Sequence, residues 1–187
     1  MNVSAEDQDF SITQKVLHWL IGLAIMFDLF IAQKFGGVMT DIDRFDSRND
    51  HASLGTLVAF LFVVRVFIRI KRGTPALPNG LPRWQTQLAH AMHWALYVLI
   101  GLLIVSGIGS AINANSIVSP FGAFDYGDGV KWVFAFDLFR AVHEFSTKAI
   151  MVLIVIHVLA ALYHVFSKHR FLTVRMLRFW RSEKSSR

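Results

Sequence analysis

Apolar positions along the chain fall into four long runs separated by polar segments. The runs cover residues 16–33, 52–70, 88–112 and 142–167. A helix needs about 20 consecutive apolar residues to cross the hydrocarbon core of a bilayer, and each run approaches or exceeds that length. The first run contains Asp28, and the second contains Arg65, whose side chain is long enough to snorkel towards the interface. The pattern predicts an all-α integral membrane four-helix bundle, forming a single domain over residues 1–187.

The segments outside these runs differ in character. Residues 73–83 are rich in Pro and Gly and cannot continue a helix. Residues 113–139 form a longer segment with three glycines and many aromatics, suited to the membrane interface or to capping a buried site. Within the tail 168–187, basic and apolar residues alternate over 170–181, which predicts an amphipathic helix on an anionic lipid leaflet. Residues 1–10 are acidic and polar, unlike a cleaved signal peptide, so the first helix is expected to be retained.

Composition narrows the chemistry that is open to the chain. Of its 187 residues 54% are hydrophobic and 17% are charged, which is apolar for a soluble domain. The absence of cysteine excludes disulfides, thiolate-bound iron–sulfur clusters, tetracysteine zinc and covalently attached c-type haem. Metal chemistry must therefore use the eight histidines, the methionines or the carboxylates.

The basic residues predict how the chain is oriented. Lys and Arg crowd into residues 69–83 and 168–187, next to hydrophobic runs, so the net charge of +6 indicates a membrane surface and no nucleic acid. The side with both termini carries Lys15, Arg69, Lys71, Arg72, Arg83 and the basic tail. The other side carries Lys34, Arg44, Arg48, Lys131 and Arg140. The positive-inside rule then places both termini in the cytoplasm. We call this predicted cytoplasmic side the inner side and the opposite one the outer side.

Four histidines fall at two depths in this topology. His18 lies near the inner end of the first helix, and His51 lies at the outer end of the second. On the fourth helix, His143 is at the outer end and His157 follows 14 residues later, about 21 Å along the axis and within about 40° of the same face. Low-spin haem takes one imidazole on each side of its ring, from facing helices at equal depth. The predicted pairs are therefore His18 with His157 and His51 with His143, holding two haems b in the core of the bundle.

The residues alone allow other roles for these histidines. A single histidine in a membrane is often only hydrogen-bonded to a neighbouring helix, but four that match in depth favour ligation. Zinc is disfavoured because pairs at two depths do not make a cluster of three or four ligands. Asp28 fits a proton path, a snorkelling residue or a polar contact between helices.

A second group of polar residues lies near the predicted inner haem. His90, His93 and Tyr97 form a stripe at the start of the third helix, and His164 continues the face of His157. With Arg72, residues His93 and His164 are suited to bind a haem propionate or a quinone headgroup such as that of ubiquinone. Simple anchoring of helix ends at the interface is the alternative role for these histidines.

Five stretches of the chain resemble a known family. They are LHWL at 17–20, HASLG at 51–55, VVRVFIRIKRGTP at 63–75, LAHAMHWALYVLIGLLIVSG at 88–107 and HEFSTKAIMVLIVIHVLAALYHVF at 143–166. In their order and spacing these stretches resemble the bacterial cytochrome b561 family of four-helix dihaem membrane cytochromes, which is related to the b-type subunits of hydrogenases and formate dehydrogenases. The resemblance covers all four spans. It implies electron transport in the bacterial inner (plasma) membrane, with His18, His51, His143 and His157 as axial haem ligands.

The resemblance also bears on the reaction. One member of the family is a superoxide oxidase, which passes electrons from superoxide to ubiquinone. We therefore expect a dihaem cytochrome that exchanges electrons between the periplasmic side and membrane quinone, with superoxide as one candidate donor. A relay subunit that serves a separate periplasmic redox partner is the alternative, and a haem-free transporter or scaffold is the third hypothesis.

The charge of the outer loops bears on which molecule donates the electrons. They are slightly acidic overall, with Asp41, Asp43, Asp46, Asp50, Asp125, Asp128 and Asp137 against five basic residues. Steering of the superoxide anion requires a locally positive surface, which leaves a patch around Lys34 or Arg140 as the candidate. The segment PFGAFDYGDG at 120–129 is an alternative docking element for a periplasmic electron donor.

Overall fold

The structure is a computed structural model that describes residues 9–33, 40–75, 81–167 and 170–179. These residues form helices and no strand: α1 Ile12–Gln33, α2 Asp41–Arg72, α3 Arg83–Ile112, the short 3-10 helix η2 Pro120–Gly122, α4 Val133–Phe166 and α5 Phe171–Leu177. Helices α1 to α4 are each long and apolar enough to cross a membrane. The predicted all-α fold with four spans is therefore confirmed.

Local sequence explains where the first two helices begin. Helix α1 starts with a capping box, in which Ser11 Oγ accepts from Gln14 N at 3.3 Å and Gln14 Oε1 accepts from Ser11 N at 3.0 Å. Helix α2 starts after Thr40, whose Oγ1 accepts from the backbone N–H of Asp43 at 3.1 Å. This cap lets α2 begin at Asp41, well before the apolar run at 52–70, because polar residues continue the helix outside the lipid.

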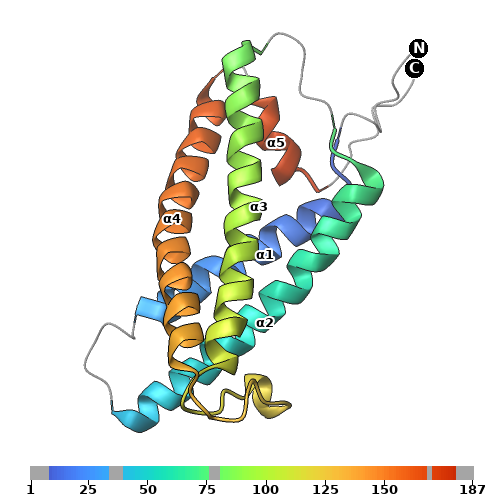
Figure 1. Ribbon diagram of the computed structural model, residues 1–187. Helices are drawn as coiled ribbons and strands as arrows, with labels where there is room; N and C mark the ends of the chain where they lie inside the picture. The colour runs from blue at the N-terminus through green and yellow to red at the C-terminus, as the bar shows by residue number, and fades with distance from the viewer. Residues whose placement is uncertain (1–8, 34–39, 76–80, 168–169, 180–187) are drawn as a thin grey trace, which may run out of the picture.

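The four long helices pack as two pairs. Helix α1 lies along α2 and helix α3 lies along α4, whereas the two pairs contact each other much less (Figure 1). Large apolar side chains cover the outside of the bundle; Phe60 and Phe134, for example, are 67% and 83% exposed. An apolar outer surface of this extent is what helices facing lipid require.

The segment between α3 and α4 folds over the outer end of α2 (Figure 1). An isolated bridge closes the segment, with Tyr126 N donating to Val118 O at 2.8 Å. Among the hydrogen bonds that fasten it to α2 are Ser119 N to Asn49 Oδ1 at 3.0 Å, Phe121 N to Ser53 Oγ at 2.7 Å, and Tyr126 Oη with Thr56 Oγ1 at 3.1 Å. These bonds hold the segment against the outer end of α2.

Helix α5 fastens the opposite, inner end of the bundle. Thr173 Oγ1 donates to Ala161 O at 3.0 Å and Trp19 Nε1 donates to Met176 O at 3.0 Å, while Lys15 Nζ donates to the carbonyl of Arg178, directly after the helix, at 2.7 Å. The start of α1 and the end of α4 therefore lie at the same end. The guanidinium of Arg175 is buried over the Phe10 ring at 5.2 Å, and this burial lowers the pKa of Arg175.

The helix in the tail is shorter than the pattern over 170–181 predicts. It ends at Leu177, and Arg178 is extended with its carbonyl bonded to Lys15 instead of to a further helical N–H. Residues 168–169 and 180–187 of the predicted amphipathic tail lie outside the described residues, as do Lys34 and residues 76–80 of the Pro/Gly-rich loop. Contact of this tail with the lipid surface stays a prediction.

Candidate functional site

The four predicted ligands meet in two pairs inside the bundle. The ring centroids of His18 and His157 are 6.2 Å apart, and those of His51 and His143 are 6.0 Å apart. His18 is on α1 and His51 is on α2, whereas both of their partners are on α4. Each pair therefore spans the interface between the α1–α2 pair and the α3–α4 pair.

This spacing fits two imidazoles that share one iron. Two such rings on opposite sides of a metal have centres about 6 Å apart, because each metal–nitrogen bond is about 2.0 Å and the ring adds about 1.1 Å. The observed separations of 6.2 and 6.0 Å meet that requirement. The rings are also inclined to each other, by 69° and 80°, so neither pair is stacked face to face. Both pairs thus have the ring separation that two axial ligands of one iron require.

Two of the predicted ligands are followed by a glycine on the same helix. Gly22 follows His18 by four residues, and Gly55 follows His51 by four residues, so each glycine lies one helical turn beyond its histidine. A Cβ atom placed on either glycine would meet no heavy atom within 4 Å. A residue without a side chain permits close approach of a ligand to the backbone. The repeated pattern His-x-x-x-Gly on α1 and α2 is a signal that sequence reasoning from the histidines alone missed.

Hydrogen bonds fix the orientation of the outer pair. The Nδ1 atom of His51 lies 2.8 Å from Oδ1 of Asp28 on α1. The Nδ1 atom of His143 lies 3.1 Å from the Leu103 carbonyl and 3.2 Å from Oγ of Ser106, both on α3. A partner at Nδ1 sets the tautomer and leaves Nε2 as the metal-binding nitrogen. Asp28 is thus a polar contact between helices, directed at a predicted ligand.

A third histidine joins the inner pair. The ring of His93 on α3 has its centroid 6.1 Å from that of His157, at an interplanar angle of 69°. This is the same spacing as between His18 and His157. His93 was expected near the inner haem, and the structure places it beside the ring of a predicted ligand. The ring distances alone therefore leave two candidates for the partner of His157.

Arginines lie near this inner cluster. Arg65 donates from Nη1 to the carbonyl of Gln14 at 2.9 Å and from Nε to the hydroxyl of Tyr97 at 3.1 Å. Gln14 precedes His18 by four residues and Tyr97 follows His93 by four residues, so the guanidinium lies within about one turn of both histidines along their helices. Arg69 is also over the Tyr97 ring, at 5.0 Å. Arg65 bridges α1 and α3 instead of snorkelling, a role that sequence reasoning did not predict.

The remaining predicted site residues lie farther towards the inner end. His164 is seven residues beyond His157 on α4, and its ring is 5.5 Å from that of Tyr163. Arg72 is exposed in the last turn of α2. The structure thus brings His93 to the inner pair and leaves Arg72 at the surface.

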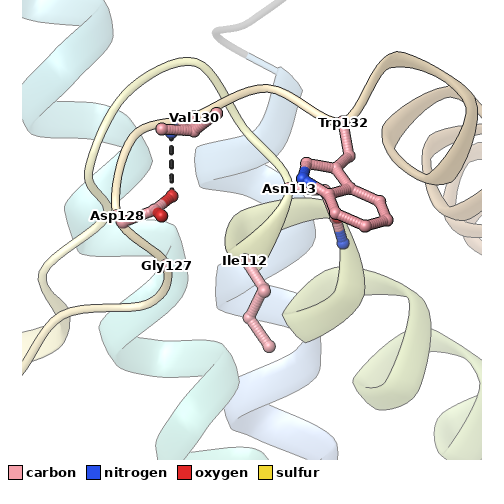
Figure 2. A pocket seen from close by; sticks show the side chains of 6 residues that line it. All are labelled: Ile112, Asn113, Gly127, Asp128, Val130 and Trp132. Atoms are coloured by element: carbon pink, nitrogen blue, oxygen red, sulfur yellow. Dashed lines mark hydrogen bonds between the residues drawn. The ribbon is translucent and has the colours of Figure 1, made fainter.

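Two shallow pockets lie on the outer side. Figure 2 shows one between the end of α3 and the following segment, where Asp128 accepts from the backbone N–H of Val130 at 2.9 Å and the Trp132 indole forms one wall. The other is lined by Arg44, Phe45, Arg48, Asn115 and Ser116, with Arg48 donating to the Ser116 hydroxyl. This second pocket brings two arginines together at the start of α2, a helix end that also carries Asp43, Asp46 and Asp50.

Comparison with known proteins identifies the family of this chain. The chain matches the family model described as prokaryotic cytochrome b561 over residues 9–179. It is 26% identical over 164 residues to a probable superoxide oxidase CybB of Yersinia pestis, covering 83% of this chain and 88% of the relative. It is 28% identical over 174 residues to cytochrome b561 homolog 2 of Escherichia coli (strain K12), covering 89% of each. The four helices able to span a membrane and the match over most of the chain agree: this protein belongs to the prokaryotic cytochrome b561 family of haem-binding, electron-transferring membrane proteins.

Proposed function

We propose that this protein binds two haems b and transfers electrons from the outer side of the membrane to a membrane quinone. His51 and His143 would hold the outer haem, and His18 and His157 the inner one. When bound, haem b supplies a one-electron couple between ferric and ferrous iron. The single observation that carries the proposal is that His143 and His157, both on α4, each face a histidine ring from the α1–α2 pair at ligand spacing, 6.0 and 6.2 Å.

The spacing along α4 supports transfer across the membrane. His143 and His157 are 14 residues apart, which corresponds to about 21 Å along the helix. The hydrocarbon core is about 30 Å thick, so the two ligand pairs cover most of its depth.

Superoxide is our candidate for the donor. Arg44 and Arg48 are one turn apart on α2 and line the same outer pocket. Clustered positive charge raises the local concentration of an anion and speeds its capture. The similarity to a probable superoxide oxidase of Yersinia pestis supports the same choice. Two superoxide anions would give up two electrons and become two molecules of dioxygen.

The proposed acceptor is a ubiquinone-like headgroup on the inner side. His93, beside the ring of His157, and His164, farther along α4, would offer N–H donors to the quinone carbonyls, and Arg72 would stabilise a reduced headgroup. The isoprenoid tail would enter from the bilayer. One quinone would take up the two electrons, together with two protons from the aqueous phase, to give the quinol.

The outer segment favours a second candidate, a relay subunit served by a protein donor. Phe121 and Trp132 in this segment are 61% and 71% exposed. Exposed aromatics on a segment that is fastened to the outer end of α2 are suited to docking a redox partner. Such a protein would bind haem and react with its partner, but it would not oxidise superoxide.

Rapid mixing of the purified protein separates these candidates. Oxidised protein is mixed with superoxide while the haem absorption is followed, and the reduced protein is then mixed with a water-soluble ubiquinone analogue. Our proposal predicts fast haem reduction in the first step and fast reoxidation in the second. No reduction by superoxide would favour the relay subunit, and no reduced-minus-oxidised haem spectrum with any reductant would favour the haem-free transporter or scaffold.

A further inference from the structure

The carboxylate of Asp28 contacts a predicted haem ligand from within a membrane-spanning helix. Oδ1 of Asp28 lies 2.8 Å from Nδ1 of His51, and the two side chains are 16% and 28% exposed. A carboxylate at this depth is costly unless it has a partner, so such residues usually serve a function. Here the partner is the ring nitrogen opposite the one that would bind iron.

A carboxylate at this position changes the ligand as well as orienting it. It accepts the Nδ1 proton and draws it away from the ring, which makes Nε2 a stronger electron donor to a metal. A stronger donor and a nearby negative charge both stabilise ferric over ferrous iron, and so lower the reduction potential. His143, the other ligand of the outer pair, contacts a carbonyl and a hydroxyl, which are neutral groups.

The inner pair has surroundings of the opposite sign. The guanidinium of Arg65 is held by the Gln14 carbonyl and the Tyr97 hydroxyl, close in level to His18 and His93. A fixed positive charge stabilises ferrous iron, which is less positive than ferric iron, and raises the potential. The charges of Asp28 and Arg65 therefore act in opposite directions at the two ends of α4.

We infer that Asp28 is a positioning residue that keeps the outer haem at a lower potential than the inner one and so sets the direction of electron transfer from outer to inner. This inference rests on the proposed binding of two haems. It assigns to Asp28 an electronic role, beyond a polar contact that merely joins α1 to α2.

Redox titration of the purified haem-loaded protein tests the inference. The titration follows the haem absorption of the wild type, Asp28→Asn, Asp28→Glu and Asp50→Asn. The outer component is identified as the one that His143→Ala removes. Asp50→Asn is the matched control, because Asp50 is exposed and directly precedes His51 in the sequence. Electron paramagnetic resonance of each variant reports the ligand field of each low-spin haem.

In the wild type, the outer component should have the lower midpoint potential. Asp28→Asn should shift that component upward and change its g values, while the inner component stays in place. Asp28→Glu keeps a carboxylate at this position, so its outer potential should stay close to the wild-type value. Asp50→Asn should leave both potentials unchanged. Two haems with unaltered potentials in Asp28→Asn, or an equal shift of both, would overturn the inference.

The inference stays testable if the Asp28→Asn variant loses the outer haem. If Asp28→Asn does not retain the outer haem, the order of potentials in the wild type decides, and a higher potential for the outer component overturns the inference. Haem quantitation on the same wild-type sample distinguishes the two proposals. Fewer than two haems per chain would contradict the proposed function, whereas two haems with the wrong order would contradict only the role of Asp28.

Discussion

The imidazole of His143 lies directly against Gly107: a Cβ atom added at position 107 would stand only 3.1 Å from Cε1 of the histidine ring. The contact joins α3 to the same ring that Leu103 and Ser106 hold through Nδ1. Helix α3 therefore acts as a support that fixes one ligand of the outer pair from behind. A larger residue at 107 must displace the ring.

Gly107→Ala should weaken binding of the outer haem by about tenfold, the lower end of what is lost when a group supporting a metal ligand is disturbed. The measurement is haem titration of the apoprotein, followed by the absorption of the low-spin form. Gly101→Ala on the same helix is the control, because a Cβ atom there meets nothing within 4 Å. Equal affinities in both variants would mean that the contact with Gly107 does not position the ligand.

Substitution of single histidines should resolve which ring pairs with His157. We expect His18→Ala to abolish the inner haem and His93→Ala to leave both haems bound, although the two rings are equally close to His157. His51→Ala and His143→Ala should both remove the outer haem. Optical and electron paramagnetic resonance spectra of the variants provide the measurement. Loss of a haem in His93→Ala together with its retention in His18→Ala would reverse the assignment.

Reversal of one charge in the outer arginine pocket should slow the reaction with superoxide. Arg44→Glu is expected to reduce the rate of haem reduction by about tenfold at low ionic strength, and to weaken the dependence of that rate on salt. Arg83→Glu, at the opposite end of the bundle, should leave the rate unchanged. Equal rates in Arg44→Glu and the wild type would show that superoxide does not approach through this pocket.

His164→Ala should slow reoxidation of the reduced protein by a ubiquinone analogue several-fold, while both haem spectra stay intact. The physical reason is the loss of a hydrogen-bond donor to the quinone, which can be worth a factor of about ten in rate. Stopped-flow absorption provides the measurement, with His93→Ala as the second variant. If neither variant changes the rate, the quinone does not bind at these residues, and the region beneath the outer segment is the alternative site.

The four spans could be predicted from the sequence, because each depends on properties of a single helix. Hydrophobic length gives each span, and the 14-residue spacing of His143 and His157 gives two depths on one face. The partners on α1 and α2 followed from alternating helix direction. The structure brings those same rings to 6.2 and 6.0 Å.

Features of the site that depend on contacts between helices could not be predicted. The contacts of Asp28 with His51, and of Arg65 with Gln14 and Tyr97, require the rotation and register of one helix against another. Hydrophobic patterning leaves both open, because lipid-facing and core-facing positions are equally apolar in membrane helices. The pocket at Arg44 likewise forms only when the outer segment folds onto α2.

The central claim is that this chain holds two haems b through four histidines at two depths. Haem content of the purified, fully reconstituted protein tests it most directly, by a pyridine haemochrome assay set against protein mass from amino-acid analysis. The account predicts two haems per chain, all extractable into acidified organic solvent, as expected for a chain without cysteine. A ratio of one haem per chain, or no haem at all, would contradict it.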